Sequence, residues 1–396
     1  MTIFLGGGFA AKYLRGGGNF SVPLQWMLGL RRLKLDAFWL EHLPSEGNTR
    51  EDERKIANFQ RQLRAHGLAG RYCVLYHKTP ASVHDLDAIR CIGMSKRELL
   101  DRLAGPNTLL NLSYSLHPPL LLKFERRIFC DLDPSEIIYW MTRMEIGQST
   151  HHEFWTIGLK VNDPDCKLLK MAPSKLPGMQ TSSLPPNQIR WKTFYPLVDT
   201  KLYRSQPRPR SPKFTTIGQW YWGGAVEVNG EFPDLSKKRA FEPYLDLPKL
   251  VPKAKFELAM HMAADDPDCA RLRKHRWHVV DPHRLAATPA KYRRYLASAL
   301  AEFTVIKGVD VNWRTGWLSD RAAAFLATGR PVITEDSGAG QYLPRESGFH
   351  FIADVEGTAA AVQDVMANWP RCSREARDCA VEIFDSVKNL QKILGI

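Results

Sequence analysis

Short apolar runs alternate with amphipathic stretches along this chain, and no other feature of the sequence restricts its fold as strongly. Runs of strand length separated by stretches of helical length predict parallel sheets with crossover helices. The polar, turn-rich residues 43–54 predict a surface loop. In the first half, where 22–33 reads as an apolar-faced helix, the apolar runs are TIFLG (2–6), DAFWLE (36–41), YCVLYH (72–77), TLLNLS (108–113) and RRIFCDLDP (126–134).

The alternation stops between about 172 and 213, where proline gathers first with serine and then with basic residues. Such segments make stiff connectors, and domain boundaries fall in them. A second series of apolar runs follows: FTTIGQWYW (214–222), KFELAMH (255–261), WHVVDP (277–282), EFTVIKG (302–308), RPVITED (330–336) and GFHFIAD (348–354). Among the helices expected between and after them are 291–303, 319–329, 358–369 and 373–394.

We therefore predict an α/β protein of two doubly wound, Rossmann-like domains. The first covers 1–200, a linker covers 201–213, the second covers 214–380, and a helix at 381–396 returns to the first domain. Doubly wound sheets bind ligands outside the carboxyl ends of their strands, so we expect the site in a cleft where the two domains face each other.

The composition narrows the partners. The 396 residues include 55 Lys and Arg against 42 Asp and Glu, a net charge of +13. This excess suits a nucleic-acid partner, although the diphosphate of a sugar nucleotide or solvated basic faces also account for it. The seven cysteines are scattered and never in CxxC spacing, which fits a reducing cytoplasm and neither a disulfide framework nor a zinc site. No apolar stretch approaches the ~20 residues of a membrane span, and the N-terminus lacks the basic region of a signal peptide.

The stretch RTGWLSDRAAAFLATGRPVI (314–333) predicts a helix whose first turn holds an anion. Ser319 is a suitable N-cap, and Gly316 lacks a side chain where a phosphate would approach. Arg314 and Arg321 bracket that position, and arginine grips phosphate oxygens bidentately. Asp336 follows the next strand, where it could accept hydrogen bonds from sugar hydroxyls. The alternative is a capped core helix that binds nothing.

The first predicted strand opens into two glycine triplets, 6–8 and 16–18. Gly16, Gly17 and Gly18, followed by Asn19, permit a sugar or phosphate to approach the backbone closely. A flexible loop without a ligand is the alternative.

Carboxylates and imidazoles in the first half are candidates for the catalytic base. Asp131 and Asp133 end a predicted strand, so either could remove the proton of an acceptor hydroxyl. Pro134 marks a helix start, so capping is the alternative role. His151 and His152 compete as bases near neutral pH, and packing is the other explanation for this pair.

GWLSDRAAAFLATGRPVITEDSG (316–338) resembles the donor-binding signature of GT-B glycosyltransferases, which transfer sugars from nucleotide sugars. It is similar in particular to a bacterial and phage-associated group with a GWFSDR…LASGRPV…DTG pattern. The likeness covers nearly the whole chain, through GGGNFSVPLQWMLGLRRL (16–33), LLNLS (109–113), IFCDLDP (128–134), HHEFWTIG (151–158), FEPYLDLP (241–248), VVDP (279–282), YRRYLASALAEFTVIKG (292–308) and EIFDSVKNL (382–390).

The resemblance implies the GT-B fold, with the nucleotide sugar in the second domain. Many such families carry a glutamate for the ribose in the helix that here reads AAAF, so the ribose contact stays unassigned. The residues implied to bind the donor are Lys237, Glu302, Lys307, Arg314, Gly316, Ser319, Arg321, Asp336, Ser337 and Gly338.

We therefore expect a nucleotide-sugar-dependent glycosyltransferase, with a UDP-sugar as co-substrate. Cationic side chains and a helix N-terminus would stabilise the leaving diphosphate, so we expect no metal site and no tightly bound cofactor. The acceptor we favour is 5-hydroxymethylcytosine in double-stranded DNA, because the chain is basic and phage DNA glucosyltransferases use this fold. A glycan, lipid-linked or natural-product acceptor is the alternative, as is a nucleic-acid-binding protein with an inactive cleft. We expect a monomer or dimer in the cytoplasm of a bacterium or phage-infected cell.

Overall fold

The computed structural model describes residues 1–78, 85–171, 180–223, 226–227, 230–263 and 265–396. The chain divides into two compact units. The first contains Met1–Ile157, Leu169–Phe194 and Leu390–Ile396, and the second contains Gly158–Leu168 and Tyr195–Asn389. Each unit is built on one mainly parallel sheet with helices, so the predicted α/β class is confirmed.

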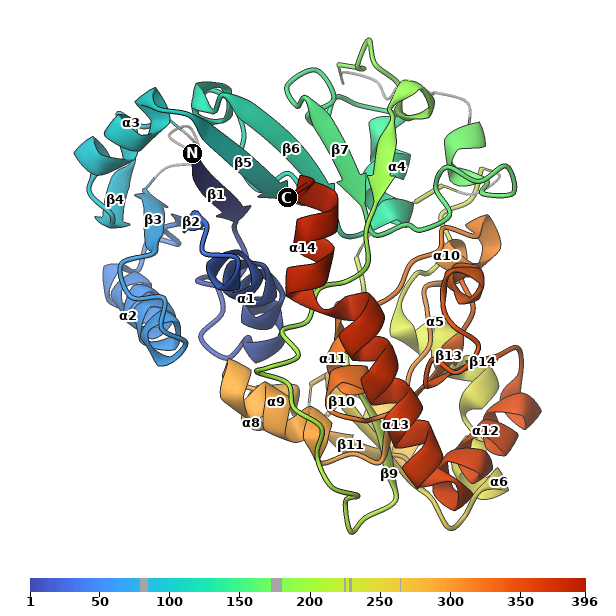
Figure 1. The fold of residues 1–396 in the computed structure, drawn as a ribbon. Helices are drawn as coiled ribbons and strands as arrows, with labels where there is room; N and C mark the ends of the chain where they lie inside the picture. The colour runs from blue at the N-terminus through green and yellow to red at the C-terminus, as the bar shows by residue number, and fades with distance from the viewer. Residues whose placement is uncertain (79–84, 172–179, 224–225, 228–229, 264) are drawn as a thin grey trace. The chain divides into compact units, whose positions relative to one another are not determined.

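The first sheet has eight strands in the order β4-β3-β2-β1-β5-β6-β7-β8 (Figure 1). Neighbouring strands are parallel except β3 and β4, which are antiparallel. The chain winds outward from β1 to β4 and then returns to β5 on the other side of β1, so the order reverses between β1 and β5. The strands are β1 (Thr2–Gly7), β2 (Asp36–Pro44), β3 (Tyr72–His77), β4 (Arg90–Gly93), β5 (Asn107–Leu112), β6 (Arg126–Asp131), β7 (Glu153–Thr156) and β8 (Trp191–Thr193).

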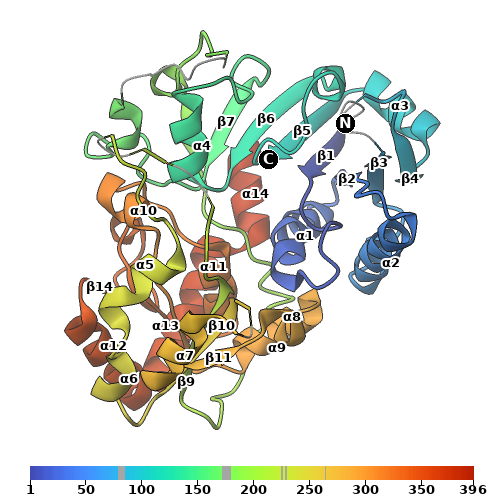
Figure 2. The same cartoon turned by 180° about the vertical axis from the view of Figure 1, so that it is seen from behind.

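The helices of the first unit are α1 (Gly17–Arg32), α2 (Thr49–Ala65), α3 (Lys96–Ala104), α4 (Pro134–Met141) and the short 3₁₀ turns η2 (Leu120–Lys123) and η4 (Pro186–Gln188). Figures 1 and 2 show α1 beside β1 and β2, which it contacts. The prediction of a surface loop over 43–54 is wrong, because α2 begins inside it. Asn48 caps that helix by accepting the Glu51 N–H at 3.1 Å, and the helix buries Phe59 and Leu63.

The second sheet has six parallel strands in the order β11-β10-β9-β12-β13-β14. The chain builds outward from β9 to β11 and then crosses back to β12, so the order reverses between β9 and β12. The strands are β9 (Lys213–Gln219), β10 (Lys255–His261), β11 (His278–Val280), β12 (Ala301–Phe303), β13 (Val332–Glu335) and β14 (Phe349–Ile352).

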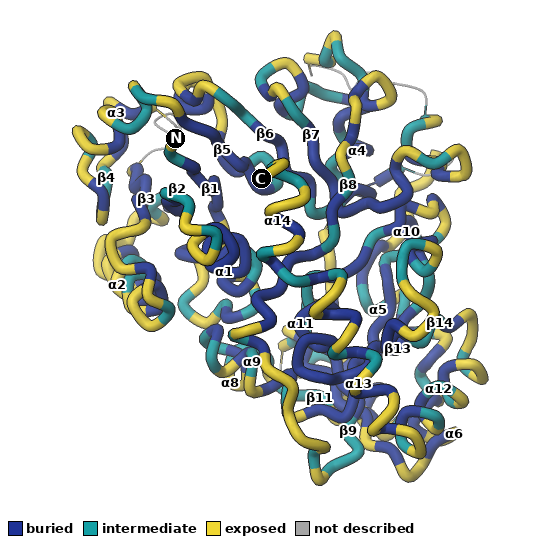
Figure 3. Tube along the Cα trace, in the orientation of Figure 1, coloured by how far each residue is buried: buried dark blue, intermediate teal, exposed yellow. Residues whose placement is uncertain are grey.

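Two apolar cores cover the two faces of this sheet. One packs α9 (Pro289–Ala297), α11 (Asp320–Ala327) and α13 (Trp369–Cys379) against it. The other packs α6 (Leu247–Leu250), α7 (Pro267–Lys274) and α12 (Val355–Ala367). Figure 3 shows strands such as β13 as buried segments. The helical elements are α5 (Lys237–Phe241), η5 (Glu242–Tyr244), α6 (Leu247–Leu250), α7 (Pro267–Lys274), α8 (Pro282–Leu285), α9 (Pro289–Ala297), α10 (Gly308–Trp313), α11 (Asp320–Ala327), η6 (Ala339–Tyr342), α12 (Val355–Ala367), α13 (Trp369–Cys379), η7 (Ala380–Phe384) and α14 (Ser386–Leu394), with η3 (Leu168–Lys170) where the chain passes between units.

Two predicted helices differ from the structure. The helix expected over 291–303 ends at Ala297, because 301–303 pairs with β9 and β13 as β12. The helix expected over 373–394 is interrupted by the π-turn η7 and restarts at Ser386. In the described part of the chain, no helix combines the length and apolar character that crossing a bilayer requires.

Candidate functional site

The donor residues predicted from the sequence gather at the carboxyl ends of β9, β12 and β13 in the second unit. Lys237 begins α5 after β9, Lys307 caps α10 after β12, and Asp336 follows β13. Because the strand order reverses between β9 and β12, this edge is where a doubly wound sheet binds a ligand.

Glu302 and Arg321 form a buried ion pair at this edge. The Arg321 Nε donates to Glu302 Oε1, while its two Nη groups donate to the Ile217 carbonyl at 2.9 Å and the Thr304 hydroxyl at 3.1 Å. Arg321 is therefore occupied inside the protein, and the expectation that it brackets an open anion position is wrong. Glu302 Oε2 is buried and has no hydrogen-bond partner among the described residues.

Lys237 lies beside this pair as a half-buried ammonium. Its Nζ donates to the Val305 carbonyl and lies 3.5 Å from the Thr304 Oγ1. Burial first, and then the neighbouring Arg321, lower the pKa of Lys237 to about 7, although Glu302 and Glu335 oppose the shift. No carboxylate in the described ranges forms an ion pair with it. An ammonium in this environment gains stability when an anion arrives.

Arg314 provides a second open cation. Its Nε donates to Asp165 Oδ2 at 2.8 Å, and Lys160 Nζ donates to the same oxygen at 2.6 Å. These hydrogen bonds, from Lys160 first and Arg314 second, lower the pKa of Asp165 to about 2. The Arg314 side chain is half-exposed, and its Nη groups make no hydrogen bond with the residues described. Its φ of 54° is left-handed, a strained conformation that clusters at functional sites.

Gly316 is needed for a backbone contact. A Cβ built on it would lie 2.5 Å from the Lys160 N, and its φ is +74°. The carbonyls of Thr315 and Gly316 accept the N–H groups of Lys160 at 3.1 Å and Leu159 at 3.3 Å. The segment Gly158–Leu168 fills the space that we expected a phosphate to use. The explanation of Gly316 as a point of phosphate approach is therefore wrong, and close backbone packing replaces it.

The predicted N-cap of α11 is confirmed. Ser319 Oγ accepts the N–H groups of Arg321 at 3.1 Å and Ala322 at 3.4 Å, so the first turn is already partly satisfied. The AAAF stretch of this helix is buried in the core and presents nothing to a ribose.

The TEDSG turn closes the same edge. Asp336 Oδ1 accepts the N–H groups of Gly338 at 2.8 Å and Gly340 at 3.1 Å, which leaves Oδ2 for a ligand. Ser337 is buried and donates to the Trp317 carbonyl at 2.7 Å. Gly338 has a φ of +93° and packs over the Lys160 side chain.

One aromatic side chain lies beside Lys307. The Lys307 Nζ lies 5.8 Å from the centroid of the Trp222 ring, which is 45% exposed, whereas the equally exposed Tyr221 donates to Asp266 and lies beside Lys238. In the GQWYWGG stretch, Trp220 is buried as packing, while Gly224 lies outside the described residues. Exposed rings beside a cation can stack on a base or sugar.

In the first unit the glycine loop follows β1. Gly16 is the N-cap of α1, no side chain caps that helix, and no acidic residue stands in its first turn, which contains Gly17, Gly18 and Asn19. The N–H groups of this turn suit an anion or hydroxyl.

The sequence prediction missed Glu41, which fixes this loop. Its carboxylate is buried, and it accepts the Ala11 N–H at 2.8 Å and the Trp39 indole at 2.9 Å. Burial raises the pKa of Glu41 to about 7. A Cβ on Gly8 would meet the neighbouring His42 ring at 2.3 Å. The acid–histidine pair that follows the apolar run of β2 is the sequence signal that could have identified these residues.

Asp131 and Asp133 take different positions. Asp131 is fully buried, with Oδ2 accepting the Thr156 hydroxyl at 2.6 Å and Oδ1 accepting the Asp133 N–H at 2.8 Å. Contrary to expectation, it presents no oxygen to a substrate. Asp133 is half-buried at the N-cap position of α4, and its Oδ1 accepts the Ser135 hydroxyl at 3.4 Å. Of the four predicted bases, Asp133 has the accessible carboxylate at a strand's carboxyl end.

The histidine pair does not supply an open base. His151 is buried, with Nδ1 2.8 Å from the Gly147 carbonyl and Nε2 3.1 Å from Asn111 Nδ2, and burial lowers its pKa to about 4. His152 is exposed, but it precedes β7 at the amino end of that strand and binds Arg127. The prediction of His151 or His152 as the catalytic base is therefore wrong.

One group of possible metal ligands lies in the second unit. Ligand atoms of His350, Asp364 and Cys372 lie within 4.8 Å of one another, on β14, α12 and α13. Asp364 is already bound to Arg371 at 2.7 Å and to Asn368 at 2.8 Å. The group belongs to this ion-pair network and is separate from the donor residues.

No family model matches the sequence, and no curated protein matches it. Solved structures resemble the chain over its full length. HepE of Anabaena, in complex with UDP and glucose, is 10% identical, with 100% of this chain and 98% of that chain covered and a TM-score of 0.54. OtsA in its apo form is 11% identical, with 100% and 98% covered and a TM-score of 0.54. A glycosyltransferase from Rickettsia africae is 8% identical, with 100% and 96% covered and a TM-score of 0.54.

At these identities the likeness concerns the fold. The two units with their parallel sheets match GT-B glycosyltransferase structures, so the predicted GT-B fold is confirmed.

Proposed function

We propose that this protein transfers a sugar from a nucleotide-diphosphate sugar to an acceptor hydroxyl, with the donor bound by the second unit. The observation that carries the proposal is Lys237, an ammonium without a carboxylate partner among the described residues, at the reversal point of a GT-B sheet. The similar HepE structure contains UDP and glucose, which favours a UDP-sugar as donor.

The proposed chemistry relies on fixed positive charge. As the sugar leaves, negative charge grows on the diphosphate, and Lys237, Lys307 and Arg314 stabilise it without reorganising. Asp336 Oδ2 accepts hydrogen bonds from sugar hydroxyls. Arg321 donates to the Thr304 hydroxyl beside Lys237, and Glu302 holds Arg321 in place through their ion pair, so both act as positioning residues.

The first unit, on this proposal, presents the acceptor. The glycine loop before α1 receives it, and Asp133 removes the proton of the attacking hydroxyl. Our preferred acceptor is 5-hydroxymethylcytosine in double-stranded DNA, supported by the net charge of +13 and by basic clusters such as RRLK (31–34) and KFERR (123–127). All seven cysteines are free thiols, as suits the reducing cytoplasm in which we place the protein.

Incubation with radiolabelled UDP-glucose and either hydroxymethylcytosine duplex DNA or a panel of oligosaccharides tests the acceptor. Label in DNA supports the proposal, and label confined to a carbohydrate replaces DNA with a glycan acceptor. Arg314→Ala tests the donor site separately, because it should weaken UDP binding at least about tenfold by calorimetry. Arg208→Ala is the control, since this exposed arginine precedes β9 and, within the part of the chain that the structure describes, its side chain binds the Met366 carbonyl alone.

A further inference from the structure

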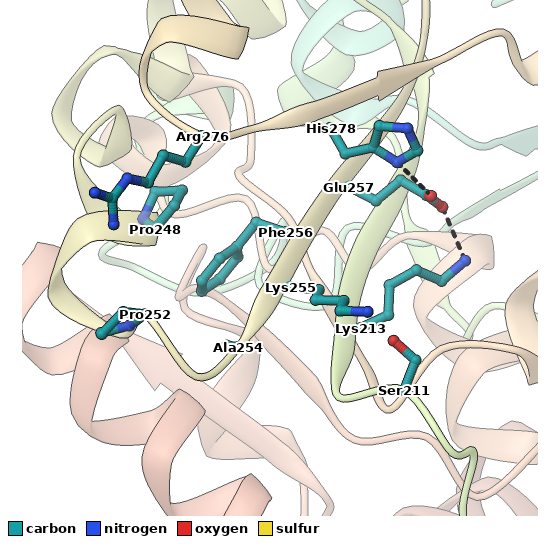
Figure 4. A pocket seen from close by; sticks show the side chains of 10 residues that line it. All are labelled: Ser211, Lys213, Pro248, Pro252, Ala254, Lys255, Phe256, Glu257, Arg276 and His278. Atoms are coloured by element: carbon teal, nitrogen blue, oxygen red, sulfur yellow. Dashed lines mark hydrogen bonds and ion pairs between the residues drawn. The ribbon is translucent and has the colours of Figure 1, made fainter.

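A pocket of about 430 Å³ opens at the amino ends of β9, β10 and β11 (Figure 4). Its lining residues are Ser211, Lys213, Pro248, Pro252, Ala254, Lys255, Phe256, Glu257, Arg276 and His278. A second hollow of about 510 Å³ shares Lys213, Glu257 and His278 with it and adds Arg284, Lys291 and Arg294. We call the two together the amino-edge pocket.

The amino-edge pocket lies at the opposite end of the strands from the donor site. Lys213, Lys255 and His278 are the first residues of β9, β10 and β11. A seven-residue strand is ~20 Å long, so one ligand of ordinary size cannot occupy both sites.

The charge inside the pocket is partly neutralised by Glu257. Its Oε1 accepts Lys213 Nζ at 2.8 Å, and its Oε2 lies 3.0 Å from His278 Nδ1 (Figure 4). The Tyr295 hydroxyl also donates to Oε1 at 2.8 Å. Burial raises the pKa of Glu257, but the hydrogen bonds from Lys213 and Tyr295 outweigh it, so the pKa lies below its usual value. Glu257 is therefore an anion whose charge is already paired with these partners.

The remaining cations of the pocket have no such partner. Five exposed side chains make no ion pair or hydrogen bond within the described ranges: Lys255, Arg276, Arg284, Lys291 and Arg294. Arg276 is also held at a left-handed φ of 67°. Like charges gathered on one concave surface repel each other, and a bound polyanion relieves the repulsion.

We propose that the amino-edge pocket binds a small, multiply phosphorylated ligand, distinct from the sugar donor. The volume lies in the range of small-molecule sites, whereas a nucleic-acid backbone needs an extended track of charge. Arginine binds phosphate oxygens bidentately, and three arginines line this pocket.

Calorimetric titration of the full chain with tripolyphosphate, in saturating UDP, tests this proposal. We expect one tripolyphosphate to bind per chain. The double variant Lys255→Gln/Arg294→Gln should lower the affinity for tripolyphosphate at least about tenfold. Arg273→Gln/Lys274→Gln, on exposed α7 residues that do not line the pocket, removes the same charge and should change affinity less than about threefold.

If the two double variants lose equal affinity for tripolyphosphate, the net positive charge of the protein accounts for the binding, and the proposed pocket is overturned. Tripolyphosphate could fail to bind while a 20-base-pair duplex binds, with an affinity that only the pocket variant weakens. That result would overturn the small ligand and assign the pocket to nucleic acid. If UDP itself does not bind, the proposed donor site fails, and the same titration without UDP still decides the pocket.

Discussion

At the scale of single residues, the proposed donor site depends on a lysine whose charge changes near neutral pH. Burial lowers the pKa of Lys237 to about 7 in the free protein, so at pH 8 most of it is neutral. A bound diphosphate favours the charged form and raises that pKa, so UDP binding at pH 8 takes up to about one proton. Affinity should weaken as the pH rises from 7 to 9.

Calorimetry in two buffers of different ionisation enthalpy measures the proton uptake. Lys237→Arg keeps the charge at every pH, so this variant should bind UDP without taking up a proton. Uptake that persists in Lys237→Arg would assign the titration to another group.

The acceptor side gives a second prediction at this scale. Asp133→Asn keeps the shape of the side chain and removes the base, so kcat should fall at least about 100-fold while UDP affinity is unchanged. Glu136→Gln, in the first turn of the same helix, is the matched control and should retain activity. Full activity in Asp133→Asn would exclude it as the base.

At the scale of elements, the loop that contains Gly316 is held by a distant segment of the chain. Gly316 packs on the backbone of Gly158–Leu168, where a Cβ would overlap Lys160 N. Gly316→Ala should therefore destabilise the protein by ~2–4 kcal/mol, through the positive φ and the overlap together. Urea unfolding measures the loss.

Gly230→Ala separates the two causes. Gly230 has a comparable φ of +84° but open space around its Cβ position, so the loss there should be only about 1 kcal/mol. Equal losses at the two glycines would mean that the packing against Lys160 contributes nothing.

The same contact shows which part of the fold the sequence could predict. Apolar runs buried on both faces identified strands such as β3 at its exact bounds and β10 likewise, because local hydrophobicity determines them. The pairing of Gly158–Leu168 with the second unit depends on contacts more than 140 residues apart, and no local pattern encodes it. α2 was missed because its first turn is polar, and its apolar residues come later.

The site shows the same division. The motif identified the Ser319 cap, because spacing and residue type are local. The sequence patterns misjudged Arg321 and Asp131, because burial and pairing with Glu302 or Thr156 are tertiary properties. Both side chains are charged, and the sequence does not reveal whether a charged side chain already has a partner inside the fold.

At the scale of the whole molecule, the excess of 13 positive charges separates the two candidate acceptors. Each phosphate contact releases counterions, so a DNA acceptor predicts that its KM rises at least ~100-fold between 50 and 200 mM salt. A neutral oligosaccharide releases none, so its KM should change little. UDP affinity, measured in parallel by calorimetry, should fall by less than about tenfold, because only one diphosphate is neutralised. A DNA KM that is insensitive to salt would mean that the charge does not serve the acceptor, and the basic residues would then act as solvated surface or in the amino-edge pocket alone.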